Sequence, residues 1–419
     1  MRLAVLCPHF APDVAPTGEV ITRIVLELAD RHHELHVITA LPWYLNHRVE
    51  PEWEGRPVRR EATEWGSITR VHPFPTDKRD IPRRALAFAG FSVLAGATGL
   101  MGGRVDGVLA MSPPLTLGLT GRGLGLARRA PLVFNIQDVF PDVAIELGAI
   151  RGRAPIELAH RLERASYAAA DAVTVLSEDL ADNVRAKMAP RRRDDVRVIP
   201  NFVDTATIAP CDRHTPYRRE LGIGDETVVM YAGNVGFSQS LELMVSAARA
   251  LAEDPSVVFV VNGSGSALPA VQASAEGLAN MRFAPLQPRG RVPEVLATGD
   301  IHVVPLKRGL ARSSVPSKTY SVLAAARPLL ASVDPGTEVD RLVSRAGCGR
   351  SVPPEDPAAF VAALRGLLAD PPALAEMGAA GRRFVEGWAS PGAVAAAYEA
   401  LFAELGSARG DGRFAQAPR

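Results

Sequence analysis

The chain has 419 residues, of which 47% are hydrophobic and 22% are charged, a balance typical of a globular protein. This length exceeds one ordinary domain, and we expect two domains of roughly 200 residues each. The 47 basic residues nearly balance the 46 acidic ones, which argues against a nucleic-acid binder because counterion release needs a basic excess.

The cysteines and the first residues of the sequence favour a cytoplasmic protein. Cys7, Cys211 and Cys348 are scattered and odd in number, so they predict neither a disulfide framework nor a zinc knuckle. A reducing compartment is the simpler interpretation. The first apolar run turns at Pro8, and it is too short for a signal peptide and has no small-residue cleavage site.

The first half of the sequence alternates short apolar runs with longer helical patterns. The predicted strands are residues 3–7, 35–39, 108–111, 132–136, 172–176 and 196–199, and the predicted helices are 19–31, 115–128, 155–169 and 178–188. Runs of Val, Ile and Leu without polar alternation are typical of parallel strands that are buried on both faces. Their alternation with helices predicts a doubly wound sheet.

One stretch of the first half, Ala85 to Met101, carries no charge and follows Arg83 and Arg84. Its length lies at the lower edge of what spans a bilayer, and it is rich in Ala and Gly. A buried helix is one interpretation, and a helix that lies on a membrane surface beside its basic residues is another. We do not expect a membrane span.

The second half repeats the scheme. Its predicted strands are 228–232, 257–262, 301–304 and 329–331, and its predicted helices are 241–251, 268–278, 318–326 and 337–345. We place the N-terminal domain at 1–204 and the C-terminal domain at 205–391. A last helix, 392–405, is expected to pack back onto the first domain, and 406–419 to form a flexible tail.

The predicted fold class is therefore α/β, with two doubly wound, Rossmann-like domains facing a cleft. Ligands of such folds bind at the carboxyl ends of the strands, at the point where the strand order reverses. This architecture does not by itself select a function.

Three loops that follow predicted strands carry glycines. Gly18 starts the first helix, where free N–H groups and the helix dipole can bind a phosphate, although an ordinary strand-to-helix turn fits equally well. In the second domain, Gly233 and Gly236 follow one strand, and Gly263 and Gly265 follow the next. Glycines there let a ligand approach the backbone closely, and two such loops in one domain are more informative than one.

The segment from Arg312 to Tyr320 combines a helix start with cations. Pro316 precedes a predicted helix, and Arg312 and Lys318 lie on either side of it. A diphosphate would be neutralised here by both cations and by the helix dipole. An ordinary capped helix is the alternative interpretation.

Asp138 follows a buried strand of the first domain and is expected to project from its carboxyl end. A carboxylate there can act as a general base or stabilise a positively charged sugar ring. The alternative is that Asp138 or Asp142 caps a turn. The histidines show no metal-binding spacing, so we expect neither a metal site nor a cofactor.

Seven short motifs follow one another along the sequence. They are Ser-Pro-Pro-Leu at 112–115, Gln-Asp-Val-Phe-Pro-Asp at 137–142, Leu-Glu-Arg at 162–164, Ile-Pro-Asn-Phe-Val-Asp at 199–204, Tyr-Ala-Gly-Asn at 231–234, Val-Pro-Ser-Lys at 315–318 and Arg-Pro at 327–328. Together they resemble the retaining glycosyltransferases of family 4, which have the GT-B fold. The resemblance is greatest to the branch with colanic-acid and O-antigen fucosamine-type transferases, and it extends from Met1 to about Leu405.

By this resemblance, the second domain binds a nucleotide diphosphate-sugar and the first binds a sugar or lipid-linked acceptor. The implied donor-binding residues are Gly18, Gly233, Asn234, Gly236, Gly263, Gly265, Leu286, Ser313, Pro316, Ser317, Lys318 and Ser321. The implied acceptor or sugar contacts are His9, Ser112, Gln137 and Asp138. The implied catalytic residues are Asp138, Lys318 and Arg312.

Two features depart from the family pattern. Ser313 and Ser321 stand where many members carry glutamates that grip the sugar and the ribose. Residues 237–239 read Phe-Ser-Gln where a pair of basic residues is usual. Lys318, Arg312 or Lys307 must then supply the positive charge for the diphosphate.

The expected activity is metal-independent transfer of a hexosyl or N-acetylhexosaminyl group in polysaccharide or glycolipid biosynthesis of the cell envelope. One alternative is a nucleotide-sugar epimerase or hydrolase of the same fold, and another is a non-catalytic protein that binds sugar nucleotides. A Rossmann-type dehydrogenase is disfavoured because the GxGxxG fingerprint is missing. With a lipid-linked acceptor, we expect peripheral association with the inner face of the plasma membrane through Arg79, Arg83, Arg84 and 85–101.

Overall fold

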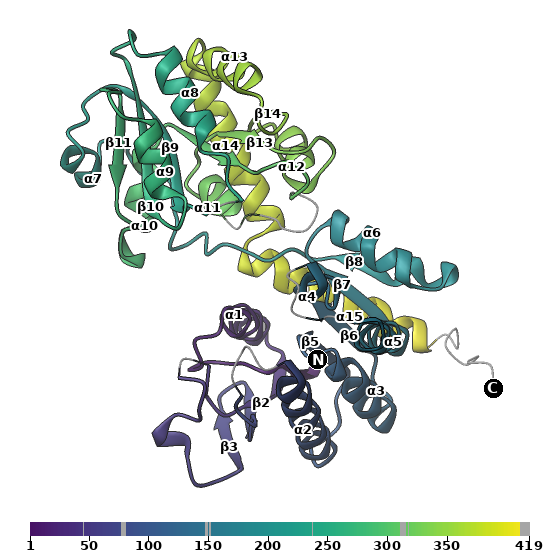
Figure 1. The fold of residues 1–419 in the computed structure, drawn as a ribbon. Helices are drawn as coiled ribbons and strands as arrows, with labels where there is room; N and C mark the ends of the chain where they lie inside the picture. The colour runs from purple at the N-terminus through teal and green to yellow at the C-terminus, as the bar shows by residue number, and fades with distance from the viewer. Residues whose placement is uncertain are drawn as a thin grey trace. The chain divides into compact units, whose positions relative to one another are not determined.

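In the computed structural model the chain forms two α/β units (Figure 1). The structure describes residues 1–44, 46–76, 81–146, 150, 152–236, 238–310, 316 and 318–410. The first unit consists of Met1–Asn201 and the segment that starts at Val394, and the second consists of Phe202–Ala393. The sequence analysis places the boundary slightly later, at residue 204.

The sheet of the first unit is parallel apart from one edge strand. Its strands among the described residues lie in the order β3-β4-β2-β1-β5-β6-β7-β8. They are β1 Arg2–Leu6, β2 Glu34–Ala40, β3 Val58–Thr63, β4 Gly66–Val71, β5 Gly107–Ser112, β6 Leu132–Ile136, β7 Ala172–Val175 and β8 Val196–Val198. β3 pairs antiparallel with β4, and the other neighbouring strands pair parallel.

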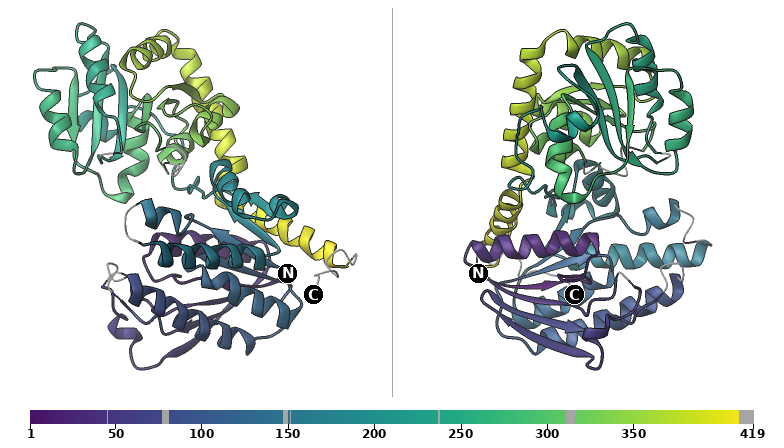
Figure 2. Two further views of the ribbon diagram at one scale, coloured as in Figure 1. Left: turned by 45° about the vertical axis from the view of Figure 1, so that its right-hand side comes forward. Right: turned by 90° about the vertical axis from the view of Figure 1, so that its left-hand side faces the viewer.

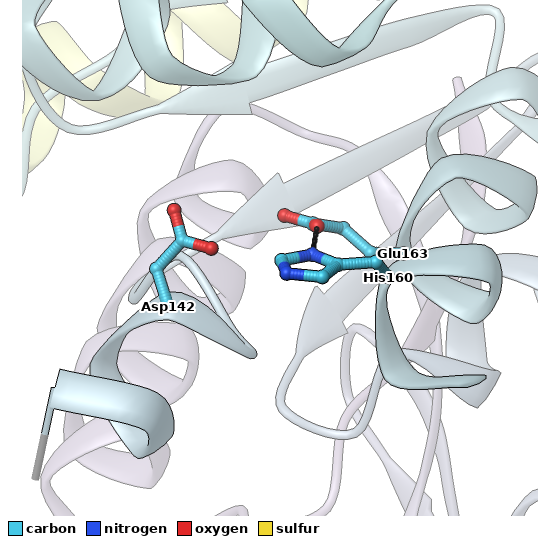
Figure 3. A group of neighbouring side chains, drawn as sticks. All are labelled: Asp142, His160 and Glu163. Carbon is cyan, nitrogen blue, oxygen red and sulfur yellow. Dashed lines mark hydrogen bonds and ion pairs between the residues drawn. The ribbon is translucent and has the colours of Figure 1, made fainter. Parts of the chain in front are cut away.

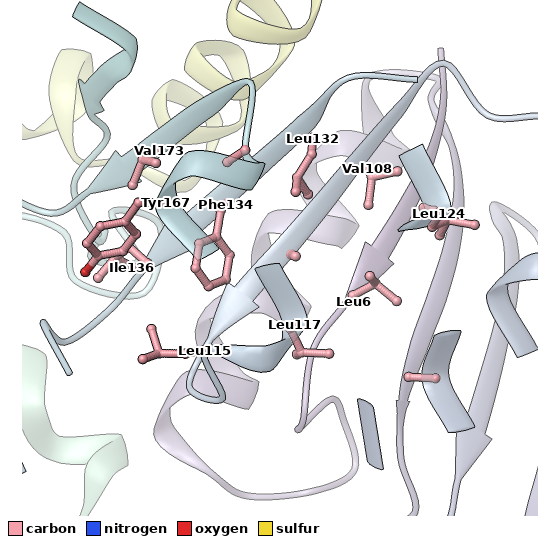
Figure 4. Close-up of a cluster of buried hydrophobic side chains, with 14 of the residues drawn as sticks. Leu6, Val108, Leu115, Leu117, Leu124, Leu132, Phe134, Ile136, Tyr167 and Val173 are labelled. Atoms are coloured by element: carbon pink, nitrogen blue, oxygen red, sulfur yellow. The ribbon is translucent and has the colours of Figure 1, made fainter. Parts of the chain in front are cut away.

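Helices cover both faces of this sheet. They are α1 Pro16–Asp30, α2 Ile81–Leu100, α3 Thr116–Arg128, α4 Asp142–Glu146, α5 Arg153–Ala169, α6 Glu178–Lys187 and α15 Pro391–Gly410. Alternate side chains of the strands, such as Leu6, Val108 and Phe134, enter one core cluster with Leu117 of α3 and Tyr167 of α5 (Figure 4). Burial on both faces explains the uninterrupted apolar runs of these strands.

The opposite face of the sheet is covered in part by α15. Gly107 of β5 leaves room for Phe402 of this helix, because a Cβ added at Gly107 would lie 2.5 Å from the Phe402 ring. Tyr398 Oη accepts a hydrogen bond of 2.9 Å from Asn135 Nδ2 and lies 3.3 Å from Thr174 Oγ1. These contacts tie the last helix to strands β6 and β7 of the first unit.

The second unit contains a fully parallel sheet (Figure 2). Its strand order among the described residues is β11-β10-β9-β12-β13-β14. The strands are β9 Thr227–Asn234, β10 Val257–Ser264, β11 Met281–Ala284, β12 Ile301–Pro305, β13 Leu329–Ser332 and β14 Gly349–Val352. Counted from β9 along the chain, this is the 3-2-1-4-5-6 order of a doubly wound sheet, which reverses between β9 and β12.

Helices also lie on both faces of the second sheet. They are α7 Pro216–Glu220, α8 Glu242–Ala250, α9 Leu268–Ser274, α10 Val292–Thr298, α11 Lys318–Ala324, α12 Glu338–Ala346, α13 Pro357–Leu368 and α14 Pro371–Trp388. Val229 and Phe259 point into a cluster that includes Phe360 of α13. Val228 and Val260 point to the other face, where Tyr217 of α7 is buried. The α/β class predicted from the sequence is confirmed in both units.

The edges of the two sheets differ from the sequence-based prediction. The β3–β4 hairpin and the edge strands β11 and β14 are absent from the predicted elements, because polar and charged residues within them leave no continuous apolar run. Helix α15 continues to Gly410, beyond Leu405 where the sequence predicts its end. Leu405 is buried, whereas Gly406 and Ser407 are exposed, so the helix continues past its last buried residue into the segment predicted as a tail.

Helix α2 contains most of the uncharged stretch from Ala85 to Met101 and is buried on one side only. It buries Phe91 and Ala95 in the core of the first unit, whereas Leu86 and Val93 are exposed. Among the described residues, no single helix has the length and apolar composition to cross a bilayer. Pro357–Leu368 and Pro371–Ala408 meet these criteria only together, as a pair bent by 100°.

The contact of α15 with the first sheet predicts a stability effect for Tyr398→Phe. We expect the free energy of unfolding to fall by about 1 kcal/mol, because buried Asn135 and Thr174 lose a hydrogen-bond partner. Urea unfolding followed by tryptophan fluorescence measures this change, because Trp43, Trp53 and Trp65 lie in the first unit and Trp388 alone lies in the second. The control is Ser407→Ala on the exposed side of α15, which should change stability by less than about 0.5 kcal/mol.

Candidate functional site

A cavity of about 640 Å³ opens in the second unit at the carboxyl ends of β9, β10 and β12. The described residues that line it are Ala232, Gly233, Asn234, Ser238, Gln239, Asn262, Leu286, Gln287, Val292, Val295, Leu296, Val304, Pro305, Leu306, Leu310, Pro316, Lys318 and Ser321. Helices α10 and α11 form its walls. The cavity lies where the strand order reverses, which is where doubly wound sheets bind ligands.

Glycines shape the edge of the sheet at this cavity. Gly233 has φ +143°, and a Cβ there would lie 3.2 Å from Lys318 Nζ, so its small size makes room for the lysine. A Cβ at Gly263 would lie 2.0 Å from the Gly233 carbonyl oxygen, and one at Gly265 would lie 2.2 Å from that of Val235. The last two glycines therefore allow β9 and β10 to stay close, and they do not line the cavity.

Lys318 is the one charged residue among the described residues that line the cavity. Its ammonium nitrogen lies 4.1 Å from the centre of the Tyr231 ring and donates a hydrogen bond to Tyr231 Oη. No carboxylate pairs with it among the described residues. Burial lowers the pKa of Lys318 to about 8. A desolvated cation without a counter-charge is suited to bind an anion.

Polar groups surround this cation. Asn262 is buried at the end of β10, and its Nδ2 donates hydrogen bonds to Tyr217 Oη at 2.6 Å and to the Pro285 carbonyl oxygen at 2.9 Å. The amide group of Asn262 therefore keeps its oxygen as an acceptor. Gln239 Oε1 accepts a hydrogen bond of 2.9 Å from the Gly236 backbone, which fixes the loop after β9.

The structure brings together half of the predicted donor-binding residues. Gly233, Asn234, Leu286, Pro316, Lys318 and Ser321 line the cavity, whereas Gly236, Gly263 and Gly265 do not. Gly18 belongs to the first unit. Arg312, Ser313 and Ser317 lie outside the described residues, as does Phe237 of the 237–239 loop.

Sequence reasoning missed several residues that line the cavity. Asn262 supplies a polar group, and Val292, Val295 and Leu296 of α10 supply an apolar wall. Asn262 offered a signal, because it ends a predicted strand just before a glycine, at the same sheet edge as Gly233. The apolar wall offered none, since Val and Leu residues are common in any core and no helix was predicted at 292–298.

In the first unit, His9 forms a buried pair with Asp13. His9 Nδ1 lies 2.7 Å from Asp13 Oδ2, and Asp13 Oδ1 accepts a hydrogen bond of 3.1 Å from the Tyr44 backbone. The His9 ring stacks on Trp43 at 5.7 Å between ring centres. A Cβ at Gly18 would lie 2.9 Å from His9 Cβ, so this glycine is needed where α1 packs against the loop.

The other predicted acceptor residues lie at the ends of β5 and β6. Ser112 is buried. Gln137 is held inside the unit, because its Nε2 donates to Asn135 Oδ1 at 2.7 Å and its Oε1 accepts from Asn201 at 3.0 Å. Asp138 has exposed surface, yet the surrounding protein raises the pKa of its carboxyl group by desolvation. Of these residues, Asp138 is best suited to exchange a proton or contact a substrate.

A cluster of Asp142, His160 and Glu163 has a spacing compatible with a metal ion, although the sequence predicts no metal site (Figure 3). Lys187 occupies this cluster. Its Nζ lies 2.7 Å from Asp142 Oδ2 and 2.7 Å from Glu163 Oε1. Tyr167 Oη also donates to Glu163 at 3.0 Å. The lysine therefore supplies the positive charge between the two carboxylates and links α4, α5 and α6.

Two doubly wound units, with an anion-suited cavity at the strand ends of the second, are the features of GT-B glycosyltransferases. The model of the Glycosyl transferase 4-like domain matches residues 17–201, and that of Glycosyl transferases group 1 matches residues 226–370. The putative colanic acid biosynthesis glycosyl transferase WcaI of Escherichia coli K12 is 30% identical over 381 residues, which cover 88% of this chain and 92% of that protein. The chain therefore belongs to the glycosyltransferase family that these two domain models and WcaI represent.

Solved structures share the fold. Sucrose-phosphate synthase from Thermosynechococcus elongatus superposes with a TM-score of 0.67 at 18% identity, over 97% of this chain and 100% of that one. Anabaena HepE in complex with UDP gives 0.66 at 13% identity, over 96% of this chain and 100% of that one. At these identities the likeness shows the two-domain architecture.

The position of Lys187 between two carboxylates predicts that Lys187→Ala is strongly destabilising. Glu163 is buried, and removing its cation should cost about 3 kcal/mol of unfolding free energy. Urea unfolding monitored by circular dichroism measures the loss. Lys307→Ala, at a lysine that does not line the cavity, is the control and should stay within about 0.5 kcal/mol of the parent. Equal stability of the Lys187 variant and the parent would contradict the role of the ion pairs.

Proposed function

We propose that the chain is a retaining glycosyltransferase that transfers a sugar from a nucleotide diphosphate-sugar to a sugar or lipid-linked acceptor. The donor is held in the cavity of the second unit, and the acceptor binds in the first. The transferred group is a hexosyl or N-acetylhexosaminyl residue, and the product belongs to polysaccharide or glycolipid biosynthesis. Neither a metal ion nor another cofactor takes part.

The observation that carries this proposal is the buried ammonium group of Lys318. A diphosphate placed against it supplies the counter-charge that the described residues of the cavity do not. As the bond between sugar and diphosphate breaks, negative charge grows on the leaving phosphate. A fixed cation in a site of low dielectric stabilises that growing charge, which is electrostatic catalysis by preorganisation.

The relatives support the choice of substrates. HepE, which shares the fold, has been crystallised with UDP, a nucleoside diphosphate of the kind proposed here. WcaI is described as a colanic acid biosynthesis transferase, and colanic acid is a polysaccharide. The apolar wall from α10 and the polar groups at Asn262 and Gln287 suit a nucleoside better than a simple phosphate.

The proposed reaction needs no metal because Lys318 performs the task that a divalent cation performs elsewhere. Among the described residues, the cavity is lined by no acidic side chain, and carboxylates are the usual ligands of Mg²⁺. The acceptor hydroxyl attacks the face of the sugar from which the diphosphate departs. Its proton passes to an oxygen of the leaving phosphate. In the first unit, the carboxylate of Asp138 contacts a hydroxyl group of the acceptor.

Nucleotide binding tests the donor proposal directly. Thermal unfolding of the protein with UDP, GDP, ADP and their common sugars should show one nucleotide that raises Tm, because a ligand of the folded state stabilises it. The shift should persist in EDTA. With that donor, the anomeric configuration of the product, measured by NMR, should match the donor. No shift with any nucleotide contradicts the donor site, and donor turnover without acceptor indicates an epimerase or hydrolase.

Lys318 predicts a pH dependence of donor binding. The protonated lysine attracts the diphosphate, and a bound diphosphate raises its pKa. Affinity should therefore be constant at low pH and fall as pH rises through about 8, where the unbound lysine loses its proton. Isothermal titration calorimetry across this range measures the effect.

Two variants separate this charge from other groups. Lys318→Ala should weaken donor binding by about tenfold or more at neutral pH, since a charge-assisted hydrogen bond is lost. Lys318→Arg keeps its charge, so its affinity should not fall as pH passes through about 8. A wild-type affinity that is independent of pH over this range would refute the role of Lys318.

A further inference from the structure

Helix α2 exposes an apolar stripe on the surface of the first unit. Leu86, Val93 and Leu100 are 74%, 70% and 51% exposed, and their spacing of seven residues puts them on one side of the helix. Met101, directly after the helix, is 72% exposed. These exposed side chains do not contribute to the core of the first unit, because α2 packs against the core through Phe91 on a different side of the helix.

Helix α3 lies beside α2 and widens the stripe (Figure 1). Small residues hold the two helices together: Ser92 Oγ lies 2.7 Å from Thr116 Oγ1, and a Cβ at Gly96 would lie 3.2 Å from Thr120 Cγ2. Outward from this contact, α3 exposes Leu119 and Leu126, again seven residues apart. The two stripes form one surface, which we call the α2–α3 face.

The charges of the two helices have a single sign, although Arg122 of α3 pairs with Asp171 at 3.6 Å and contributes little to the net charge of the surface. Their sequences contain Arg83, Arg84, Arg122 and Arg128 and neither Asp nor Glu. Arg128 Nη2 donates a hydrogen bond of 2.6 Å to the Leu100 carbonyl oxygen at the end of α2. Arg83 and Arg84 lie at its beginning, so cations stand at both ends of the apolar stripe.

We infer that the α2–α3 face binds the surface of a membrane that contains anionic phospholipids. Helices that lie in a bilayer interface present an apolar side to the acyl chains and basic residues to the headgroups. A second copy of this chain would bring the same arginines against one another, whereas anionic headgroups neutralise them. The surface goes beyond the proposed transfer reaction, and it stands whether or not the cavity binds a nucleotide.

Vesicle sedimentation with the full chain tests this inference. The vesicles contain phosphatidylcholine alone, or phosphatidylcholine and phosphatidylglycerol in equal parts. The protein should bind the anionic vesicles about tenfold more tightly than the neutral ones, and added salt should weaken binding. Leu86→Ser with Val93→Ser should lower binding to anionic vesicles by about tenfold or more, because two exposed apolar anchors are lost.

Matched controls identify the surface. Leu26→Ser removes an exposed leucine from α1, and it should leave vesicle binding unchanged. Arg83→Glu with Arg84→Glu should reduce binding to anionic vesicles, whereas Arg383→Glu, an exposed arginine of the second unit, should not. The far-UV circular dichroism spectrum and the Tm of each variant, measured without nucleotide, report that it is folded.

Two results would overturn the inference. In the first, the double serine variant and the parent bind vesicles equally. In the second, the parent ignores vesicles but forms a dimer in size-exclusion chromatography that the double serine variant does not form. The latter would assign the α2–α3 face to self-association.

Discussion

The desolvated ammonium group of Lys318 is the constraint on which the candidate site depends. Removing a lysine from water without a counter-charge costs free energy, and an anionic ligand that supplies the charge recovers it. The surroundings fit this single group: Gly233 leaves room for its nitrogen, and Tyr231 offers both an aromatic face and a hydroxyl oxygen. Neither contact neutralises it. The chemistry of the cavity therefore follows from one charge that no carboxylate among the described residues compensates.

The sequence was sufficient to predict the central strands and many of the helices between them, although not α10, α13 and α14. Apolar runs such as Val108 to Met111 are typical of strands that are covered on both faces, so their positions indicate a doubly wound sheet. The β3–β4 hairpin escaped because charged residues interrupt its apolar residues, and its pairing depends on the neighbouring β2. Local patterns predict the interior of a sheet better than its edges.

Less of the candidate site could be predicted. Lys318 and Gly233 were identified by motif, but their contact depends on how α11 packs against β9, which sequence spacing does not encode. Gly263 and Gly265 looked like ligand contacts, and the structure explains them by the close approach of two backbones. The sugar-binding role of Gln137 stays a prediction. The side chain of Gln137 is held by Asn135, and Asn135 in turn donates a hydrogen bond to Tyr398, a residue 263 positions later that local sequence patterns do not link to it.

The return of α15 makes the first unit discontinuous in sequence, with the second unit inserted between its two parts. On the ribosome, β6 and β7 emerge long before Tyr398 and Phe402, which cover one face of them. The second unit has all of its strands available earlier and can complete its own core first. The N-terminal sheet must therefore keep part of an apolar face uncovered until Tyr398 and Phe402 have been synthesised, and an uncovered apolar face exposes this unit to aggregation during synthesis.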